Sequence, residues 1–402
     1  MNGGTSFERK LGEYTTGRDG PTIVVTGGVH GNEPFGAHAV REVLATLEQR
    51  QAPLRGRLIG VAGNLGGLAA NQRYLDRDLN RRWHFDDLLA MTTNPKTRED
   101  REQVALLRTF REIMAGADGP VVFLDLHSTS GEGAPFAAMA DVLRNRPVAF
   151  ALPLPVVLGL EEAINGTMLG YLCDLGHVGV AVEGGQHEDP ETGRHHVAMV
   201  WITLVSAGAL SASDVPDLED RRQRLADAAG NVPRILEIRH RHAVVDGDGF
   251  EMRAGFANFS PVAARQPVAG DASGPIYAPE RGLMMLPRYQ RTGDDGYFLA
   301  RPVSRFWLRV SAIARHMGLH RLLWLLPGID RHPELDDHLI ARRKVARAAA
   351  PDVFHLLGYR RLRWMEDADR MVFTRRRPDH LGATGFPPEL DAALRHSPGG
   401  GS

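Results

Sequence analysis

The chain has 402 residues, of which 43% are hydrophobic and 24% are charged, and its formal net charge is −1. This length exceeds that of one ordinary domain, and the near-neutral charge gives no indication of a nucleic-acid partner. The single cysteine, Cys173, excludes an internal disulfide and suits a reducing compartment. No stretch is apolar for long enough to span a bilayer and no signal-peptide pattern opens the chain, so a cytoplasmic protein is expected.

The first 230 residues alternate between strand-like and helix-like patterns. Strands are expected at 22–26, 57–64, 121–124 and 178–182, and helices at 35–51, 102–114 and 197–210. Apolar strands that alternate with amphipathic helices predict an α/β layer with a largely parallel sheet. Residues 1–230 are therefore expected to form one α/β domain.

Two further regions follow this domain. Glycine or proline recurs every few residues from 235 to 301, which is typical of short strands joined by tight turns and predicts a small β-rich domain at 231–302. From 303 onward the pattern is helical and rich in arginine. Residues 303–402 are expected to form a helical extension that ends in a disordered tail at 397–402.

The start of this extension admits two interpretations. Residues 303–327 place Phe306, Val310 and Ile313 among arginines. This is the pattern of an amphipathic helix that lies on a membrane or a partner. It is also the pattern of a helix that packs on its own domain with its arginines in water, and we favour this second interpretation.

Metal-ligand side chains follow the predicted strands. His30 and Glu33 lie three residues apart in a glycine-rich turn after the first strand, a spacing that lets both reach one cation. His127 ends the third strand with Asp125 on the same face, because strand side chains alternate. Taken singly, these residues are explained equally well by a structural turn and by a histidine satisfied at a strand end.

A carboxylate in the same situation strengthens the metal interpretation. Glu183 directly follows the strand at 178–182 and precedes two glycines, where a general base can face a metal-activated water. The strand ends thus bring His30, Glu33, His127 and Glu183 to one edge of the sheet. This convergence indicates a site more strongly than any one of the motifs.

A charged loop at 73–81 supplies a further candidate group. Arg73 and Arg81 offer planar guanidinium groups for a carboxylate or an oxyanion, and Asn80 adds an amide donor. Read alone, the segment is an ordinary solvated loop.

The segments Gly27–Glu33, Arg73–Arg81 and Asp125–His127, with the strand-terminal Glu183, occur in this order. Together they resemble the aspartoacylase and succinylglutamate desuccinylase family, distant relatives of the zinc carboxypeptidases. The resemblance covers roughly residues 21–300. It implies a carboxypeptidase-like mixed or parallel sheet flanked by helices, followed by a small all-β domain.

The resemblance also implies roles for individual residues. It implies one Zn²⁺ per chain held by His30, Glu33 and His127, with Glu183 as base and later acid, Arg73 polarising the scissile carbonyl, and Asn80 and Arg81 binding a substrate carboxylate. The implied reaction is hydrolysis of the amide bond of an N-acyl amino acid or a related small carboxylate-bearing amide. Residues 1–230 would be the zinc-dependent hydrolase domain.

The sequence departs from the family in one place. Mammalian-type aspartoacylases carry a substrate-binding arginine ten residues before the catalytic glutamate, where this chain has Cys173. Recognition of a second substrate carboxylate, as in N-acetylaspartate, is therefore in doubt. His187, His195 and His196 are expected in a loop and helix start. Exposed or capping roles are favoured for them, a place in the pocket stays open for one of the three, and Tyr297 is a weaker pocket candidate.

Two other functions fit the same residues. A carboxypeptidase-like peptide or ester hydrolase would use the same site, since Asn80 and Arg81 suit a peptide's terminal carboxylate equally well. A zinc-binding regulatory protein with a vestigial hydrolase site would be favoured by loss of Glu183 or a ligand, and all are present. The acyl group, the amine and the oligomeric state do not follow from the sequence.

Overall fold

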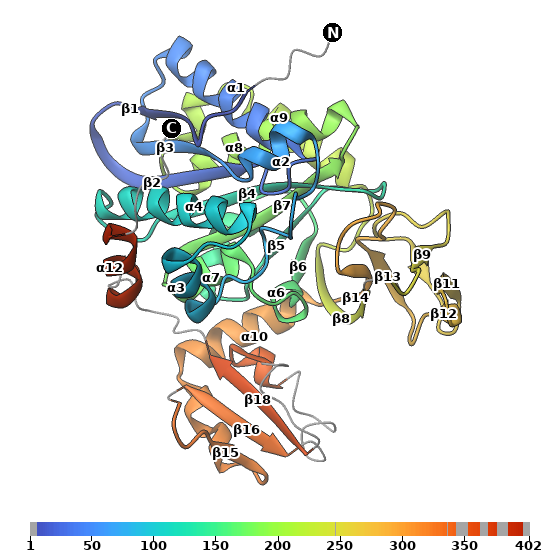
Figure 1. Cartoon of the computed structure of the whole chain (residues 1–402). Coiled ribbons are helices and arrows are strands. Elements are labelled where there is room, and N and C mark those ends of the chain that lie inside the picture. Colours follow the sequence, from blue (N-terminus) through green and yellow to red (C-terminus); the bar gives the residue numbers. More distant parts are fainter. Residues whose placement is uncertain are drawn as a thin grey trace.

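The computed structural model describes residues 6–245, 247–335, 337–342, 353–361, 369–375 and 385–396. An 11-stranded sheet crosses the molecule with helices on both faces, and two smaller sheets, of three and four strands, lie to one side and below it (Figure 1). This arrangement confirms the predicted α/β class. The predicted disordered tail at 397–402 lies outside the described residues.

The large sheet is parallel at its centre and antiparallel at both ends. Strands β3, β2, β4 and β7 run parallel to one another, β5 runs antiparallel to β7, and the strands from β8 to β10 pair antiparallel. In sheet order the strands are β1 (Lys10–Thr15), β3 (Arg55–Ala62), β2 (Arg18–Gly27), β4 (Val122–Thr129), β7 (Val178–Gln186), β5 (Phe136–Met139), β6 (Val156–Leu158), β8 (Ile235–Ala243), β14 (Asp295–Pro302), β13 (Gly282–Met285) and β10 (Pro261–Val262).

Two apolar cores form on the two faces of this sheet. Ile23 and Val25 of β2 belong to one core and Val24 to the other, because successive strand side chains point to opposite faces. The first core is covered by α1 (Pro34–Arg50), α5 (Arg146–Ala151), α8 (Pro190–Ser206) and α9 (Leu218–Ala229). The second is covered by α3 (Phe85–Thr93), α4 (Arg98–Ala115), α7 (Met168–Asp174) and α12 (Pro388–His396).

Helix α8 begins earlier than the helix predicted at 197–210. Asp189 caps α8 by accepting a hydrogen bond from the Glu191 amide, and Pro190 occupies the first turn, a position that proline favours. His195 and His196 therefore lie inside this helix and are buried, which corrects the expectation of a loop and helix start there.

The strands of the β-rich region are divided between the large sheet and a small sheet of their own. Strand β8 pairs with β6 of the α/β part, so β8, β14, β13 and β10 continue the large sheet. A separate three-stranded sheet contains β9 (Glu251–Met252), β11 (Pro267–Asp271) and β12 (Gly274–Tyr277). The region is rich in short strands as expected, and the domain boundary at 230/231 stays a prediction.

The extension contains strands as well as helices. Helix α10 (Arg305–His316) and the 3-10 helix η3 (Leu319–Leu325) precede a four-stranded antiparallel sheet of β15 (Ile329–Arg331), β16 (His338–Arg342), β18 (Arg370–Arg375) and β17 (Tyr359–Arg361). Every second residue of β16 and of β18 belongs to the core of this sheet: Leu339 lies opposite Phe373, and Ala341 lies opposite Met371. The frequent arginines hide this period of two in the sequence.

Helix α10 packs on its own chain, as in our favoured interpretation, but with a different face. Ser311 and Ala314 are buried, whereas Ile313 is 60% exposed. The side chain of Arg315 is only 5% exposed and pairs with Asp141, so the expectation that the arginines lie in water is wrong for this residue. Within the described residues no helix is long and apolar enough to cross a membrane.

Candidate active site

The turn between β2 and α1 positions the first two candidate ligands. The Glu33 amide donates to the His30 carbonyl over 3.1 Å, and the Gly31 amide donates to the Arg73 carbonyl over 3.1 Å. A β-carbon on Gly31 would lie 2.0 Å from the carbonyl carbon of Gly67, in the short helix α2 (Leu65–Ala70). Only glycine allows this turn to press against α2.

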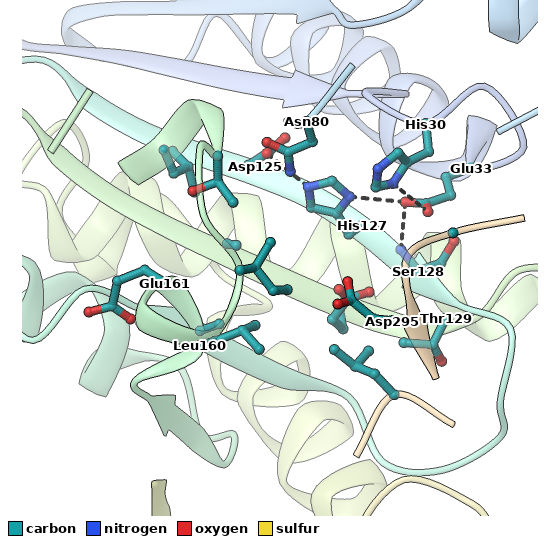
Figure 2. Close-up of a pocket in the computed structure, with 18 of the residues that line it drawn as sticks. His30, Glu33, Asn80, Asp125, His127, Ser128, Thr129, Leu160, Glu161 and Asp295 are labelled. Carbon is teal, nitrogen blue, oxygen red and sulfur yellow. Dashed lines mark hydrogen bonds and ion pairs between the residues drawn. The ribbon is translucent and has the colours of Figure 1, made fainter. Parts of the chain in front are cut away.

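His30, Glu33 and His127 converge on one point. Glu33 Oε1 lies 2.9 Å from His30 Nδ1, and Glu33 Oε2 lies 3.1 Å from His127 Nδ1 (Figure 2). One ligand atom from each of the three lies within 4.8 Å of the others, and all three side chains are buried. In the part of the chain that the structure describes, this is the one such group that could hold a metal ion.

Two further carboxylates orient the imidazoles. His127 Nε2 lies 2.8 Å from Asp125 Oδ2, and His30 Nε2 lies 3.2 Å from Asp78 Oδ1. Glu33 faces Nδ1 of both rings, so each histidine has a carboxylate at both of its nitrogens. With a cation at the Nδ1 atoms, the Nε2 proton of His127 would be donated to Asp125. Carboxylates behind histidine ligands are the usual support of a metal site.

The pKa values of Glu33 and His127 are both shifted by their neighbours. Burial alone would raise the pKa of Glu33, but His30 and His127 outweigh burial and hold that pKa well below its usual range. Burial also lowers the pKa of His127, yet Asp125 and Glu33 outweigh it and hold that pKa well above its usual value. A divalent cation would satisfy the same charges.

Glu183 lies beside His127 on the neighbouring parallel strand, with the two residues in register. Its Oε2 atom is buried and has no hydrogen-bond partner among the described residues. Burial raises the pKa of Glu183 well above its ordinary value, and the charges of His127 and Arg73 oppose that rise only in part. A buried carboxyl group with a raised pKa suits proton transfer near neutral pH.

Arg73 is held within the same cluster. It donates from Nη2 and Nε to Asp78 Oδ2 over 2.8 and 3.2 Å, and Nη2 lies 2.9 Å from His30 Nε2. The loop that carries it is organised by Glu99, which is fully buried and accepts the amides of Leu75 and Asp76. Glu99 could not be singled out from sequence patterns, because it lies on the buried face of an ordinary helix.

Arg81 and Asn80 line the site but already have partners. Asn80 Oδ1 accepts the Met168 amide over 2.9 Å, and Arg81 Nη2 donates to Asp295 Oδ2 over 2.8 Å. Asp295 also pairs with Arg241 of β8. The site therefore includes an acidic residue, 214 positions along the chain from Arg81, that the motifs did not single out.

All seven predicted site residues line one cavity of about 180 Å³. Its lining also has an apolar component, which includes Ala138, Met139, Leu160, Ile164, Leu169 and Cys173. Figure 2 shows Leu160 and Glu161 across the pocket from His30 and Glu33.

The other aromatic candidates divide between the cavity and the core. His187 lines the cavity and shares a hydrogen bond with Ser128 Oγ over 2.8 Å. His195 and His196 instead bond to the carbonyls of Gly184 and His127 from within α8. Tyr297 is fully buried in the β-rich core, away from the cavity lining. The favoured exposed or capping roles are therefore wrong for these histidines, and the alternative that one of them lines the pocket holds for His187.

The matching family is the succinylglutamate desuccinylase/aspartoacylase catalytic domain, whose sequence model matches residues 19–194. Over these residues the chain is similar to that family. The matched residues run from β2 to the first turns of α8 and contain the ligand cluster, the Arg73–Arg81 loop and Glu183.

Individual relatives cover smaller parts of the chain. A probable aspartoacylase from Parasynechococcus marenigrum is 32% identical over 173 residues, which are 40% of this chain and 52% of that protein. An N-acyl-aromatic-L-amino acid amidohydrolase (carboxylate-forming) from Mus musculus is 34% identical over 111 residues, 27% of this chain and 33% of that protein. The chain thus matches about a third to a half of the length of these curated relatives.

A solved structure extends the likeness beyond the catalytic domain. The succinylglutamate desuccinylase/aspartoacylase from Rhodobacter sphaeroides superposes with a TM-score of 0.53, covers 72% of this chain and 87% of its own, and is 19% identical. At this identity the likeness shows a shared fold and no more. It confirms the predicted resemblance at the level of architecture.

Proposed function

We propose that the protein is a zinc-dependent hydrolase that cleaves the amide bond of an N-acyl amino acid or a related small carboxylate-bearing amide. The observation that carries this proposal is the meeting, in one cavity, of a His–Glu–His cluster, a buried carboxyl group and two arginines. Similarity of residues 19–194 to an amide-hydrolysing family supports the reaction type.

The residues present fit one zinc ion. Two imidazole nitrogens and one carboxylate oxygen are a usual donor set for catalytic zinc, which keeps a fourth position open. The orphaned Oε2 of Glu183 supports this fit, since it lacks a partner on the protein side. When bound, zinc would lower the pKa of water and polarise a carbonyl group. His30, Glu33 and His127 would hold it.

The protein's own groups would perform the proton transfers and stabilise charge. Glu183 would take a proton from the attacking water onto a carboxylate oxygen and later deliver it to the leaving nitrogen. Arg73 would face the carbonyl oxygen as it becomes negative, fixed in place by Asp78. Its rigid pairing means that little reorganisation is needed as the charge develops.

Arg81 and Asn80 would bind the substrate carboxylate. Asp295 lies 2.8 Å from Arg81 Nη2, and the incoming carboxylate would share or replace this contact. Arg241 would then retain Asp295, with which it is already paired. The substrate would thereby exchange one carboxylate for another on the same guanidinium.

The apolar part of the cavity lining indicates an apolar substituent on the substrate. Met139, Leu160, Leu169 and Cys173 belong to this lining. Arg288 also lines the cavity, but its Nη1 and Nη2 atoms donate to the carbonyls of Gly293 and Phe250. We therefore propose an amide with one carboxylate and an apolar acyl group or side chain. The relative from Mus musculus is named for N-acyl-aromatic amino acids, which agrees with this choice.

A substrate panel tests the proposal. Zinc-loaded protein is incubated with N-acetyl derivatives of leucine, phenylalanine and aspartate, with N-succinylglutamate, with a dipeptide and with an ester, and released amine or alcohol is measured. We expect amine release from the apolar N-acyl amino acids at least about tenfold faster, by kcat/KM, than from the two dicarboxylates. Preference for the dipeptide or the ester would favour the carboxypeptidase-like alternative, and no turnover of any compound would favour a non-enzymatic zinc protein.

A further inference from the structure

Helix α10 carries an apolar stripe that faces solvent. Phe306, Val310, Ile313 and Met317 follow one another at the spacing of a single helix face. Phe306, Ile313 and Met317 are 63%, 60% and 68% exposed. An amphipathic helix of a globular protein ordinarily turns this face to its core, so the orientation of α10 requires a reason.

Polar contacts on the opposite face hold the helix in this orientation. Arg315 donates to the Asp141 carboxylate over 2.6 Å and to the His355 carbonyl over 2.7 Å, while Ser311 Oγ donates to the Leu356 carbonyl over 2.7 Å. Turning the apolar stripe inward would break all of these bonds and bury no equivalent partner for Arg315. The outward stripe is therefore a feature of the native fold.

The next element continues the apolar surface. In η3 and the residue after it, Leu322, Trp324, Leu325 and Leu326 are exposed, and Leu323 packs into the core of the extension. Trp307 of α10 is also exposed, at 55%. We call the exposed apolar side chains between residues 306 and 326 the extension patch. An apolar surface of this kind marks an interaction site.

The charge around the extension patch indicates what covers it. Residues 303–329 include four arginines and no aspartate or glutamate. Arg305 and Arg309 are exposed and flank the stripe of α10, and Arg321 is exposed in η3. Residues 303–402 hold 17 Lys or Arg and 11 Asp or Glu, in a chain whose net charge is −1. The positive charge is thus concentrated in the extension.

We propose that the extension patch binds the surface of an anionic lipid bilayer. Exposed Trp, Phe and Leu side chains beside arginines are the composition of helices that lie in the membrane interface, and tryptophan favours that depth. At 12 residues, α10 is about 18 Å long, too short to cross a hydrocarbon core of about 30 Å. The helix would lie along the bilayer surface.

A second copy of the chain is a poorer occupant of the patch. A two-fold interface through this patch would bring Arg305, Arg309 and Arg321 of one copy toward the same residues of the other, without acidic residues of the segment between them. Like charges at an interface oppose association. An anionic bilayer supplies the missing negative charge and accepts the apolar side chains as well.

Co-sedimentation of the full-length protein with vesicles tests the proposal. We expect binding to vesicles of phosphatidylglycerol and phosphatidylcholine, and binding at least about tenfold weaker to pure phosphatidylcholine. The double substitution Ile313→Asp/Met317→Asp should reduce binding to the mixed vesicles by at least about tenfold, because it places charge in the apolar stripe. Arg305→Glu/Arg309→Glu should remove the preference for anionic vesicles.

Tyr277→Asp is the matched control, because Tyr277 is also exposed, at 55%, but lies on β12; it should bind as the wild type does. Thermal unfolding of every variant shows whether the fold is kept. The proposal is overturned if wild type and Ile313→Asp/Met317→Asp bind mixed vesicles equally, or if neither binds. It is equally overturned if light scattering shows a dimer that this double substitution dissociates while vesicle binding is absent.

Discussion

At the scale of single residues, the site contains two carboxyl groups whose pKa values are shifted in opposite directions. Glu33 is held as a carboxylate by two histidines, whereas burial favours the protonated form of Glu183. Two carboxyl groups whose environments separate their pKa values are the usual arrangement for one binding role and one proton-transfer role. The proposed assignment of ligand and base follows from this difference.

Replacing Glu183 by glutamine separates these roles. The amide keeps the shape of the carboxyl group but cannot take a proton from water, so kcat should fall at least about a hundredfold while zinc content stays unchanged. Steady-state kinetics and metal analysis measure the two quantities. Glu188→Gln, at an exposed position on the same segment, should behave as wild type. If Glu183→Gln kept more than about a tenth of the wild-type kcat, another group would be the base.

Substitutions of Arg73 and Arg81 should change different kinetic constants. Arg81 is proposed to bind a carboxylate whose charge is the same before and during reaction, so Arg81→Ala should mainly raise KM. Arg73 is proposed to meet an oxygen that becomes negative only in the transition state, so Arg73→Lys should mainly lower kcat, by about a hundredfold. Steady-state kinetics of both variants on one substrate distinguish the binding role from the role in stabilising the transition state. A change in KM alone for both would make Arg73 a second binding residue.

At the scale of elements, glycines set the position of the ligand turn. Gly31→Ala would bring a β-carbon to 2.0 Å from backbone of α2, so the turn that holds His30 and Glu33 must shift. We expect loss of bound zinc and a free energy of unfolding lower by at least about 2 kcal/mol. Gly119→Ala is the control, since no atom lies within 4 Å of the added carbon. Full zinc content in Gly31→Ala would show that the turn tolerates displacement.

The elements also show what the sequence could predict. The central strands, the helices around them and the convergence of the ligand cluster with Glu183 were predictable, because strand ends and helix starts have local patterns and parallel strands end at a common edge. The place of the 73–81 loop in the same cavity followed only from the family resemblance. The partnership of Arg81 with Asp295 was not predictable, because it joins residues far apart in the sequence. The outward face of α10 was not either: periodicity shows that the apolar residues share a face, and buried Arg315 shows which way that face turns.

At the scale of the whole molecule, a histidine joins the extension to the large sheet. His355 lies 3.1 Å from Glu162 and 3.0 Å from Glu237 of β8. Burial lowers the pKa of His355, but these two carboxylates outweigh it and raise that pKa to about 10. The ion pairs of His355 thus join the extension to the large sheet, and they depend on the protonation of His355.

The stabilisation from His355 should therefore vary with pH in a defined direction. A pKa raised on folding, from 6.5 to about 10, contributes fully below pH 6.5 and is lost as pH rises toward 10. His355→Gln should lower Tm most at pH 6 and progressively less up to pH 10. Thermal unfolding of both proteins across this range measures the difference. A Tm difference that does not change with pH would mean that the histidine is not charged in the fold.

The central claim is that one zinc ion held by His30, Glu33 and His127 is required for amide hydrolysis, and it is tested most directly by measuring zinc content and amine release on the same samples. Wild type and His38→Ala, a substitution at an exposed position of α1, should bind about one zinc per chain and release amine. His30→Ala and His127→Ala should lose both zinc and turnover. Full zinc content in both of these variants, or undiminished amine release from zinc-free wild type, would contradict the account.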